Sequence, residues 1–341
     1  MSALPATSRE IRLTARPEGG LIGPDHLTVV DTPVPTPAPG EVLVRNRFFA
    51  VHPALRTLVG GVEGAPFPAL RPGDTLFGPA VGEVVATADG GPAPGTLVTH
   101  TLGWREHAAV PVAHLAPADP ALPDAAAHLA QGPVAYGALT RAAALREGDT
   151  VLVTGGAGAV GSMAGPIARL LGAGRVIGTT GSPWKAERMT ADLGYDAVVP
   201  RGGDGSFADR LAAAAPDGID VLVDTVGGDQ LAAALDLARD GARFALVGSL
   251  SGQLDPGTPG VTAPVTLDGF RAVLRRVTLR GYSPLDDGPA LTAEWNTRFA
   301  DWLARGLLAF PHTRIAGMHR APAALTEVMS GRYVGAVLIE P

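Results

Sequence analysis

Apolar and polar positions alternate over short segments in the N-terminal third of the chain. The alternation is clearest in residues 41–52, where Val42 and Val44 are spaced as on one face of a half-buried strand. Similar segments at 81–88 and 96–103 are separated by the turn-forming stretch DGGPAPG. This pattern predicts an irregular β-domain.

From about residue 121 onwards, helical and strand-like segments alternate. Residues 122–145 are rich in alanine and helical in pattern, with a break at Gly132–Pro133. After them, nearly continuous apolar segments alternate with amphipathic ones, which is typical of a parallel sheet covered by helices on both faces. The expected strands are 150–155, 175–180, 197–199, 219–224 and 242–248, and the expected helices are 159–172, 183–193, 206–214 and 228–239.

The remainder of the chain predicts a loop, one more strand and helix, and a C-terminal tail. Residues 249–268 are rich in Gly, Pro and Thr and predict a long surface loop of the kind that often forms a lid. A strand at 277–282 and a helix at 290–306 follow, and the tail 311–341 predicts short strands that close on the β-domain. We therefore expect an α/β protein with a β-domain of residues 1–121 and 308–341 and a doubly wound parallel-sheet domain of residues 122–307.

Composition and charge narrow the classes of function. The chain has 341 residues, 46% of them hydrophobic, and a net charge of −6, which disfavours a nucleic-acid partner. It has no cysteine, which excludes disulfides, iron–sulfur clusters, thiolate zinc sites and cysteine nucleophiles, and its histidines are not spaced as metal ligands. Without an apolar signal segment or a membrane-length apolar run, we expect a cytoplasmic protein with no membrane partner and no metal.

A G-x-G-x-x-G motif lies between an expected strand and an expected helix, in VLVTGGAGAVG. Gly156 would permit the tight turn, Gly158 would let the backbone approach a pyrophosphate, and Gly161 would let the helix and strand pack closely. With Ala159 and Val160, the start of the helix offers free N–H groups and a partial positive charge. The motif in this setting predicts dinucleotide binding; the alternative is a glycine-rich turn without a ligand.

The next strand ends without the Asp or Glu that would bind a ribose 2′-hydroxyl. Instead, Thr179 and Thr180 are followed by Gly181 and Ser182, and Lys185, Arg188 and Arg201 are close in sequence. Hydroxyl and cationic groups bind a 2′-phosphate through charge-assisted hydrogen bonds, which favours NADPH over NADH. The alternative is that Lys185 and Arg188 are solvated residues of a helix.

Several stretches resemble, in order, motifs of the zinc-free medium-chain dehydrogenase/reductases, specifically the prostaglandin reductase and alkenal double-bond reductase group. These stretches are AVHPALR (50–56), GWREHAAV (103–110), GPVAYGAL (132–139), TGGAGAVGS (154–162), GSPWK (181–185), VDTVGG (223–228) and SGRYVGAVLI (330–339). The resemblance implies a GroES-like β-domain and a Rossmann domain, with NADPH in the cleft between them. It also implies metal-free hydride transfer to the β-carbon of an α,β-unsaturated carbonyl.

The resemblance further implies roles for individual residues. Gly156 to Gly161 would hold the pyrophosphate, and Ser182 with Lys185 would hold the 2′-phosphate. The other residues implied along the cofactor are Pro133, Val134, Tyr136, Thr180, Gly181, Arg201, Val226, Gly248, Ser249, Leu250 and Tyr333. Around the substrate the chain departs from the group: His52 and Ala54 replace an aspartate and a tyrosine, and Leu254 is near the place of a loop tyrosine. This pocket would be wider and less polar, and would suit a bulky natural-product intermediate.

The group's usual donor to the developing enolate is therefore missing, and other residues are candidates for the catalytic role. Tyr282 is our first candidate, Tyr333 the second, and His52 could assist a proton transfer. The alternatives are that these side chains only pack, or that solvent or a ribose hydroxyl of the cofactor supplies the hydrogen bond. Tyr195 is expected to lie far from the cleft.

The leading hypothesis is a homodimeric, NADPH-dependent ene-reductase acting on a small molecule. Two alternatives remain open at this point. One is a quinone reductase on the same scaffold, and the other is a redox-neutral protein that binds NADPH, either a cyclase or a structural protein.

Overall fold

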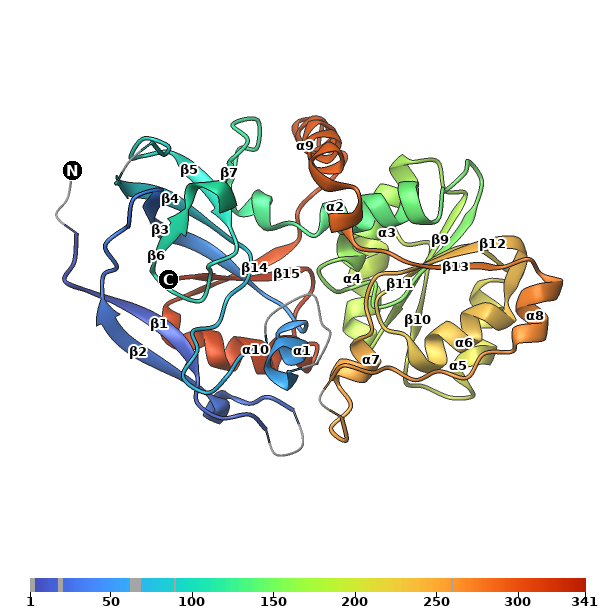
Figure 1. The fold of residues 1–341 in the computed structure, drawn as a ribbon. Coiled ribbons are helices and arrows are strands. Elements are labelled where there is room, and N and C mark those ends of the chain that lie inside the picture. The colour runs from blue at the N-terminus through green and yellow to red at the C-terminus, as the bar shows by residue number, and fades with distance from the viewer. Residues whose placement is uncertain (1–3, 18–20, 62–68, 89, 259) are drawn as a thin grey trace. The chain divides into compact units, whose positions relative to one another are not determined.

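β3 (Glu41–Val51) is an inner strand of the first sheet, and its alternating valines are buried in the core. Val42 and Val44 are fully buried and pack with Val84, Val98 and Val110 of neighbouring strands. β3 pairs antiparallel with β4, β6 and the C-terminal β15, so the tail closes this sheet as expected (Figure 1). The sheet has the order β14 (His312–Ala316), β15 (Ala336–Glu340), β3, β4 (Ala80–Thr87), β5 (Leu97–His100), β7 (Ala116–Pro117), with β6 (His107–Pro111) on β3.

This β-unit comprises Met1–Ala130, His312–Arg332 and Ala336–Pro341. The computed structural model describes residues 4–17, 21–61, 69–88, 90–258 and 260–341 of the chain. The unit's smaller elements are β1 (Thr7–Leu13) paired with β2 (Leu27–Pro33), α1 (Leu55–Gly60), α10 (Ala321–Met329), and the 3-10 helices η1 (Pro24–His26), η2 (Val112–His114), η3 (Ala125–Leu129) and η6 (Met318–Arg320).

The second unit comprises Gln131–Pro311 and Tyr333–Gly335, and we call it the α/β-unit. Its six-stranded parallel sheet confirms the predicted α/β class, and its buried central strands explain the continuous apolar segments of the sequence (Figure 1). The strand order is β10 (Ala197–Pro200), β9 (Arg175–Thr180), β8 (Thr150–Val153), β11 (Ile219–Asp224), β12 (Ala238–Leu246), β13 (Thr278–Gly281). Its helices are α2 (Gly132–Gly137), η4 (Ala138–Ala142, a π-helix), α3 (Gly161–Leu170), α4 (Pro183–Asp192), α5 (Phe207–Ala214), α6 (Gly228–Asp236), α7 (Leu250–Gln253), α8 (Gly269–Leu274), η5 (Pro284–Asp286) and α9 (Gly288–Ala304).

Three local predictions were wrong. The helix expected at 228–239 ends at Asp236, because Ala238 already pairs with Ile219 in the sheet. The C-terminal tail contains α10 between its two strands, and that helix is apolar enough to bury Leu325 and Met329. Gly132–Pro133 begins a helix rather than breaking one, since proline is favourable in a helix's first turn.

In the structure, the boundaries between the two units lie after Ala130 and after Pro311, whereas the sequence predicted boundaries at 121/122 and 307/308. Residues 122–130 belong to the β-unit because η3 packs on β3 and β4. Asp124 in the same segment pairs with Arg314 of β14. The short segment Tyr333–Gly335 is part of the α/β-unit, where the Gly335 N–H donates to the Ala157 carbonyl at 2.9 Å.

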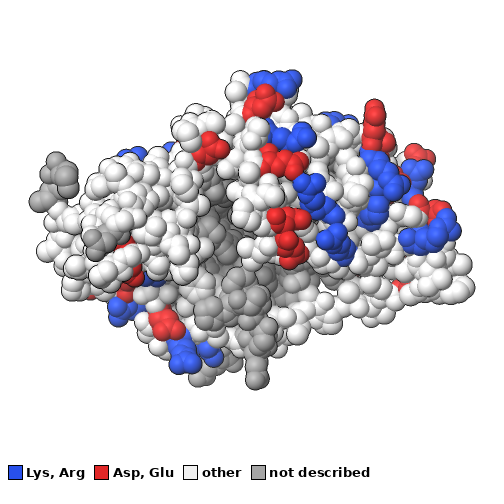
Figure 2. Space-filling view, turned by 45° about the horizontal axis from the view of Figure 1, so that its top comes forward, with Lys and Arg blue, Asp and Glu red and all other residues white. Residues whose placement is uncertain are grey.

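Acidic and basic side chains are interspersed on the face of the molecule shown in Figure 2, without a large patch of one sign. Within the described ranges, none of the helices combines the length and apolarity needed to cross a membrane.

Candidate functional site

The glycine-rich turn joins β8 to α3, and three of its glycines meet different local constraints. Gly155 has a positive φ of 62°, so it makes the tight turn that we had assigned to Gly156. A Cβ on Gly156 would lie 2.4 Å from the Met189 side chain, so this position serves close packing. A Cβ on Gly161 would lie 2.5 Å from the Gly155 carbonyl oxygen, so the third glycine is required for the approach of turn and helix.

The turn leaves backbone donors available at the start of α3. Among the described residues, no acceptor is within hydrogen-bond range of the N–H groups of Ala159, Val160 and Gly161. These donors lie at the positive end of a ten-residue helix. The arrangement fits an anion such as a pyrophosphate.

A second anion-binding cluster surrounds Gly181, at the end of β9. The Ser182 hydroxyl is buried without a hydrogen-bond partner among the described residues. Lys185, in the first turn of α4, is only 6% exposed, and burial lowers its pKa. The Arg201 guanidinium lies 3.2 Å from the position of a Cβ on Gly181, and the Arg201 N–H donates to the Thr180 carbonyl at 2.8 Å.

Neither Lys185 nor Arg201 forms an ion pair with any residue in the described ranges. The enclosed Ser182 hydroxyl is costly unless a ligand satisfies it, whereas the Lys185 side chain is largely buried with its ammonium 5.6 Å from the centroid of the Trp184 ring. A phosphate group has the acceptors and charge to do so, and the residues present therefore fit a 2′-phosphate. Arg188, by contrast, pairs with Asp192 on the exposed side of α4, in keeping with the alternative of a solvated residue, whereas Lys185 is only 6% exposed.

The loops after β11 and β12 are held together by Asp224. Its carboxylate accepts hydrogen bonds from the Thr154 hydroxyl at 2.5 Å and from the N–H groups of Val226 and Gly227 at 3.1 and 3.0 Å. Burial raises the pKa of Asp224, and these bonds act in the opposite direction. Gly248 and Leu250 donate to the Asp224 and Thr225 carbonyls at 3.2 and 3.1 Å. Asp224 is thus a cap for the loop that follows β11.

Among the residues expected beside the nicotinamide, Pro133 and Val134 are half-buried at the start of α2. Tyr136 is directed towards α9: its hydroxyl donates to Glu294, and its ring centroid lies 6.0 Å from that of Trp295. Its side chain therefore has a packing role within the α/β-unit. Ser249, the N-cap residue of α7, accepts the Gly252 N–H through its carbonyl at 3.0 Å.

The two candidate catalytic tyrosines both lie in the α/β-unit. The Tyr282 hydroxyl donates to Asp287 at 2.8 Å, and a Cβ on Gly137 would lie 1.7 Å from that hydroxyl oxygen. Burial and Asp287 raise the pKa of Tyr282. This geometry favours the packing alternative, because the phenol proton is already bound to a carboxylate. Tyr333 is half-buried in the segment that follows Arg332.

His52 follows β3 in the β-unit. Burial lowers its pKa to about 4, so the imidazole is neutral at physiological pH. A Cβ on Gly78 would lie 3.7 Å from His52 Nε2 and 3.5 Å from Trp104 Nε1, which places both side chains beside this glycine. A neutral imidazole can still donate or accept a hydrogen bond, but it cannot supply a positive charge.

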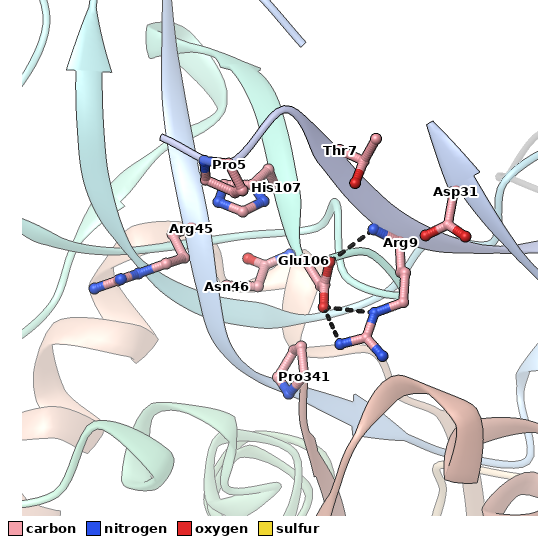
Figure 3. A pocket seen from close by; sticks show the side chains of 9 residues that line it. All are labelled: Pro5, Thr7, Arg9, Asp31, Arg45, Asn46, Glu106, His107 and Pro341. Atoms are coloured by element: carbon pink, nitrogen blue, oxygen red, sulfur yellow. Dashed lines mark hydrogen bonds and ion pairs between the residues drawn. The ribbon is translucent and has the colours of Figure 1, made fainter. Parts of the chain in front are cut away.

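A polar hollow of about 370 Å³ lies elsewhere in the β-unit (Figure 3). Glu106 accepts hydrogen bonds from the Arg9 backbone and guanidinium at 2.7 and 2.9 Å, so these charges neutralise each other. His107 is buried, and its Nδ1 lies 3.1 Å from the Ser8 hydroxyl, as suits a core-filling residue. The hollow contains none of the predicted site residues.

Three buried side chains near the glycine-rich turn make contacts that the sequence did not predict. Tyr195 lies beneath the turn, where its hydroxyl donates to the Gly161 carbonyl at 2.7 Å. Thr179 and Gln230 are joined by a hydrogen bond of 2.5 Å. No local sequence signal marks these contacts, because the partners are far apart along the chain. In the described part of the chain, no group of three or more potential metal-ligating side chains gathers.

Two family models match the chain: "N-terminal domain of oxidoreductase" over residues 9–117 and "Zinc-binding dehydrogenase" over residues 159–305. The Bacillus subtilis protein YfmJ is 30% identical, covering 98% of both chains. The NADPH-dependent curcumin reductase of Escherichia coli is 26% identical, covering 96% of this chain and 95% of the relative. CurA of Vibrio vulnificus, solved in complex with NADPH, has a TM-score of 0.87 and 26% identity, covering 97% of this chain and 98% of CurA.

With this likeness over nearly the whole chain, the fold and the glycine-rich turn define a class. The chain belongs to the medium-chain dehydrogenase/reductase superfamily, in the group of the prostaglandin, alkenal and curcumin reductases.

Proposed function

We propose that this protein is an NADPH-dependent reductase of the C=C bond of α,β-unsaturated carbonyl compounds. The single observation that carries the choice of cofactor is the cluster around Gly181, in which Ser182 is buried without a partner and Lys185 is buried without an ion pair among the described residues. The NADPH bound to CurA and the name of the curcumin reductase support the same cofactor.

In this proposal, each end of the cofactor has its own residues. The N–H groups of Ala159 to Gly161 bind the pyrophosphate, and Ser182, Lys185 and Arg201 bind the 2′-phosphate. Pro133, Val134, Val226 and the backbone of Gly248 to Leu250 lie along the nicotinamide half. The Asp224 cap, which binds the Val226 and Gly227 N–H groups, keeps that loop in one conformation.

When bound, NADPH supplies a hydride to the β-carbon, and the electron pair of the C=C bond then takes up a proton at the α-carbon. Tyr282, Tyr333 and His52 remain our candidates to stabilise the enolate oxygen. The Tyr282 hydroxyl donates its hydrogen bond to Asp287 Oδ2, so this phenol must leave its partner before it can donate to a substrate. In the observed arrangement we propose that solvent supplies the α-proton.

The reductase proposal is tested by steady-state kinetics with a panel of enones, enals and quinones. We expect NADPH to be consumed in a one-to-one ratio with saturated product, and enones to be preferred over quinones. Product formed without loss of NADPH absorbance would overturn the proposal, and so would a clear preference for quinones.

We also propose that the protein is a homodimer joined at the edge strand β13. All four residues of β13 are exposed, and its free edge can pair antiparallel with the same edge of a second copy. Beside it, α8 exposes Phe270 and Val273 at 72% and 71%. Sedimentation of the wild type should give a dimer and of Phe270→Asp/Val273→Asp a monomer, whereas a monomeric wild type would refute this part.

A further inference from the structure

A chain of hydrogen bonds links the glycine-rich turn to α6 through the end of β9. The Gly155 N–H donates to the Thr179 hydroxyl at 3.0 Å, and that hydroxyl donates to Gln230 Oε1 at 2.5 Å. The Gly156 N–H donates to the Thr179 carbonyl at 2.8 Å. Because the hydroxyl accepts one bond and donates the other, the orientation of the Gln230 amide is defined by the turn.

The other end of the Gln230 amide has no partner within the described ranges. Gln230 is 7% exposed and Thr179 is 1% exposed, so both polar side chains are nearly enclosed. Gln230 Nε2 makes no hydrogen bond to a described residue, yet it is not among the buried nitrogens that are cut off from solvent. Its two N–H donors therefore face accessible space.

The position of this amide defines what it can bind. Gln230 lies in the first turn of α6, and Thr179 ties it to the turn whose amides fit a pyrophosphate. A buried amide kept in one orientation, with its acceptor satisfied and its donors open, is suited to a ligand that brings an oxygen acceptor.

We propose that Gln230 donates a hydrogen bond to an oxygen of the adenosine diphosphate half of NADPH, and that Thr179 is the positioning residue that orients it. This inference rests on the proposed function for its ligand, but not on the reaction. It predicts a contribution to cofactor affinity that is independent of the 2′-phosphate, because the pair lies beside the turn and not in the Gly181 cluster.

Two substitutions at Gln230 separate a contact with the cofactor from a structural role. Gln230→Glu keeps the acceptor for Thr179 and the shape of the side chain, but replaces the amide donors with a carboxylate oxygen. Gln230→Met removes both the acceptor and the donors. Asn296→Asp on α9, half-buried in the same unit, controls for the added negative charge.

Affinities are measured by calorimetry at pH 8.5, where the introduced carboxyl is ionised, with NADPH, NADH and adenosine 2′,5′-bisphosphate as ligands. We expect Gln230→Glu to weaken all three by at least tenfold and Gln230→Met by about fivefold or more. The ratio of NADPH to NADH affinity should stay within twofold of wild type. Thr179→Val should weaken binding of the same ligands by a smaller factor of about three, and Asn296→Asp should have no effect.

Wild-type affinity in Gln230→Glu would overturn the inference and leave Gln230 as a support for Thr179. A loss confined to NADPH and the bisphosphate, with NADH unaffected, would also overturn it, because the amide would then act on the 2′-phosphate. If the wild type itself binds none of the three ligands, the proposed function fails, and that result is distinct from failure at Gln230.

Discussion

Replacing Lys185 with methionine tests the cofactor site through one charge. Lys185→Met keeps most of the aliphatic stem of a largely buried side chain and removes its ammonium, which has no ion pair among the described residues and lies in the same cluster as the unpartnered Ser182 hydroxyl. A charge-assisted hydrogen bond contributes about 1.5–3 kcal/mol, so the affinity for NADPH should fall by about 10- to 150-fold. NADH has no 2′-phosphate, and its affinity should change by less than about twofold.

The same substitution should stabilise the cofactor-free protein, although it weakens NADPH binding. Burial lowers the pKa of Lys185, so the unfolded chain binds more protons than the folded one between this lowered pKa and the ordinary value of 10.5. Below that window the charged lysine carries its full desolvation cost in the folded state. Lys185→Met should therefore raise the Tm at pH 7 in the absence of cofactor, while it weakens NADPH binding.

The assay is a titration of protein fluorescence with each cofactor, together with thermal unfolding of the free protein. Arg188→Ala is the matched control, because Arg188 is on the same helix but is exposed and paired with Asp192. It should change neither affinity by more than about twofold. Equal losses of NADPH and NADH affinity in Lys185→Met, or no loss of either, would refute the reasoning about the 2′-phosphate.

Three further predictions follow from single contacts. Tyr282→Phe should keep turnover within about threefold of wild type because its hydroxyl is bound to Asp287, and a tenfold loss at unchanged NADPH affinity would instead assign the phenol to the enolate. Gly161→Ala should lower the free energy of unfolding by about 3 kcal/mol or more and abolish cofactor binding, because its Cβ would meet backbone atoms at 2.5 Å. Gly202 has open space around it, so Gly202→Ala should change neither stability nor binding in the same denaturation and binding assays. His52→Gln should make the stability of the fold less sensitive to acid. Burial lowers the pKa of His52 from 6.5 to about 4 in the folded protein, so the wild type loses stability as the pH decreases through that window. Identical curves of stability against pH for the two proteins would contradict this.

The order of elements in the α/β-unit could be predicted because buried parallel strands leave a strong local pattern. Val151, Leu152 and Val153 are fully buried in β8, and a run of this kind between helical segments has few other interpretations. α10 was missed because the short apolar stretches of the tail fit strands and helices equally well. Leu325 and Met329 are four residues apart, and only their burial in the structure distinguishes the helix.

The residues of the Gly181 cluster were named from the sequence because Ser182 and Lys185 follow the end of β9 and Arg201 follows the end of β10. The supports of the glycine-rich turn could not be named, because each depends on a contact across the sheet. Gln230 reaches Thr179 across 51 positions of sequence, and Tyr195 reaches the Gly161 carbonyl across 34. The hydrogen bond from Tyr282 to Asp287 could not be predicted either, because the sequence does not show which acceptor a hydroxyl binds.

The central claim, hydride transfer from NADPH to an activated C=C bond, is tested most directly by isotope labelling. The enzyme is incubated with an enone and NADPH that carries deuterium at C4 of the nicotinamide, in separate reactions for each C4 position. The product is then analysed by mass spectrometry and NMR. The account predicts one deuterium on the β-carbon from one of the two labelled cofactors, with one NADPH oxidised for each product formed. Product without deuterium from either cofactor, or with deuterium on the carbonyl carbon, would contradict it.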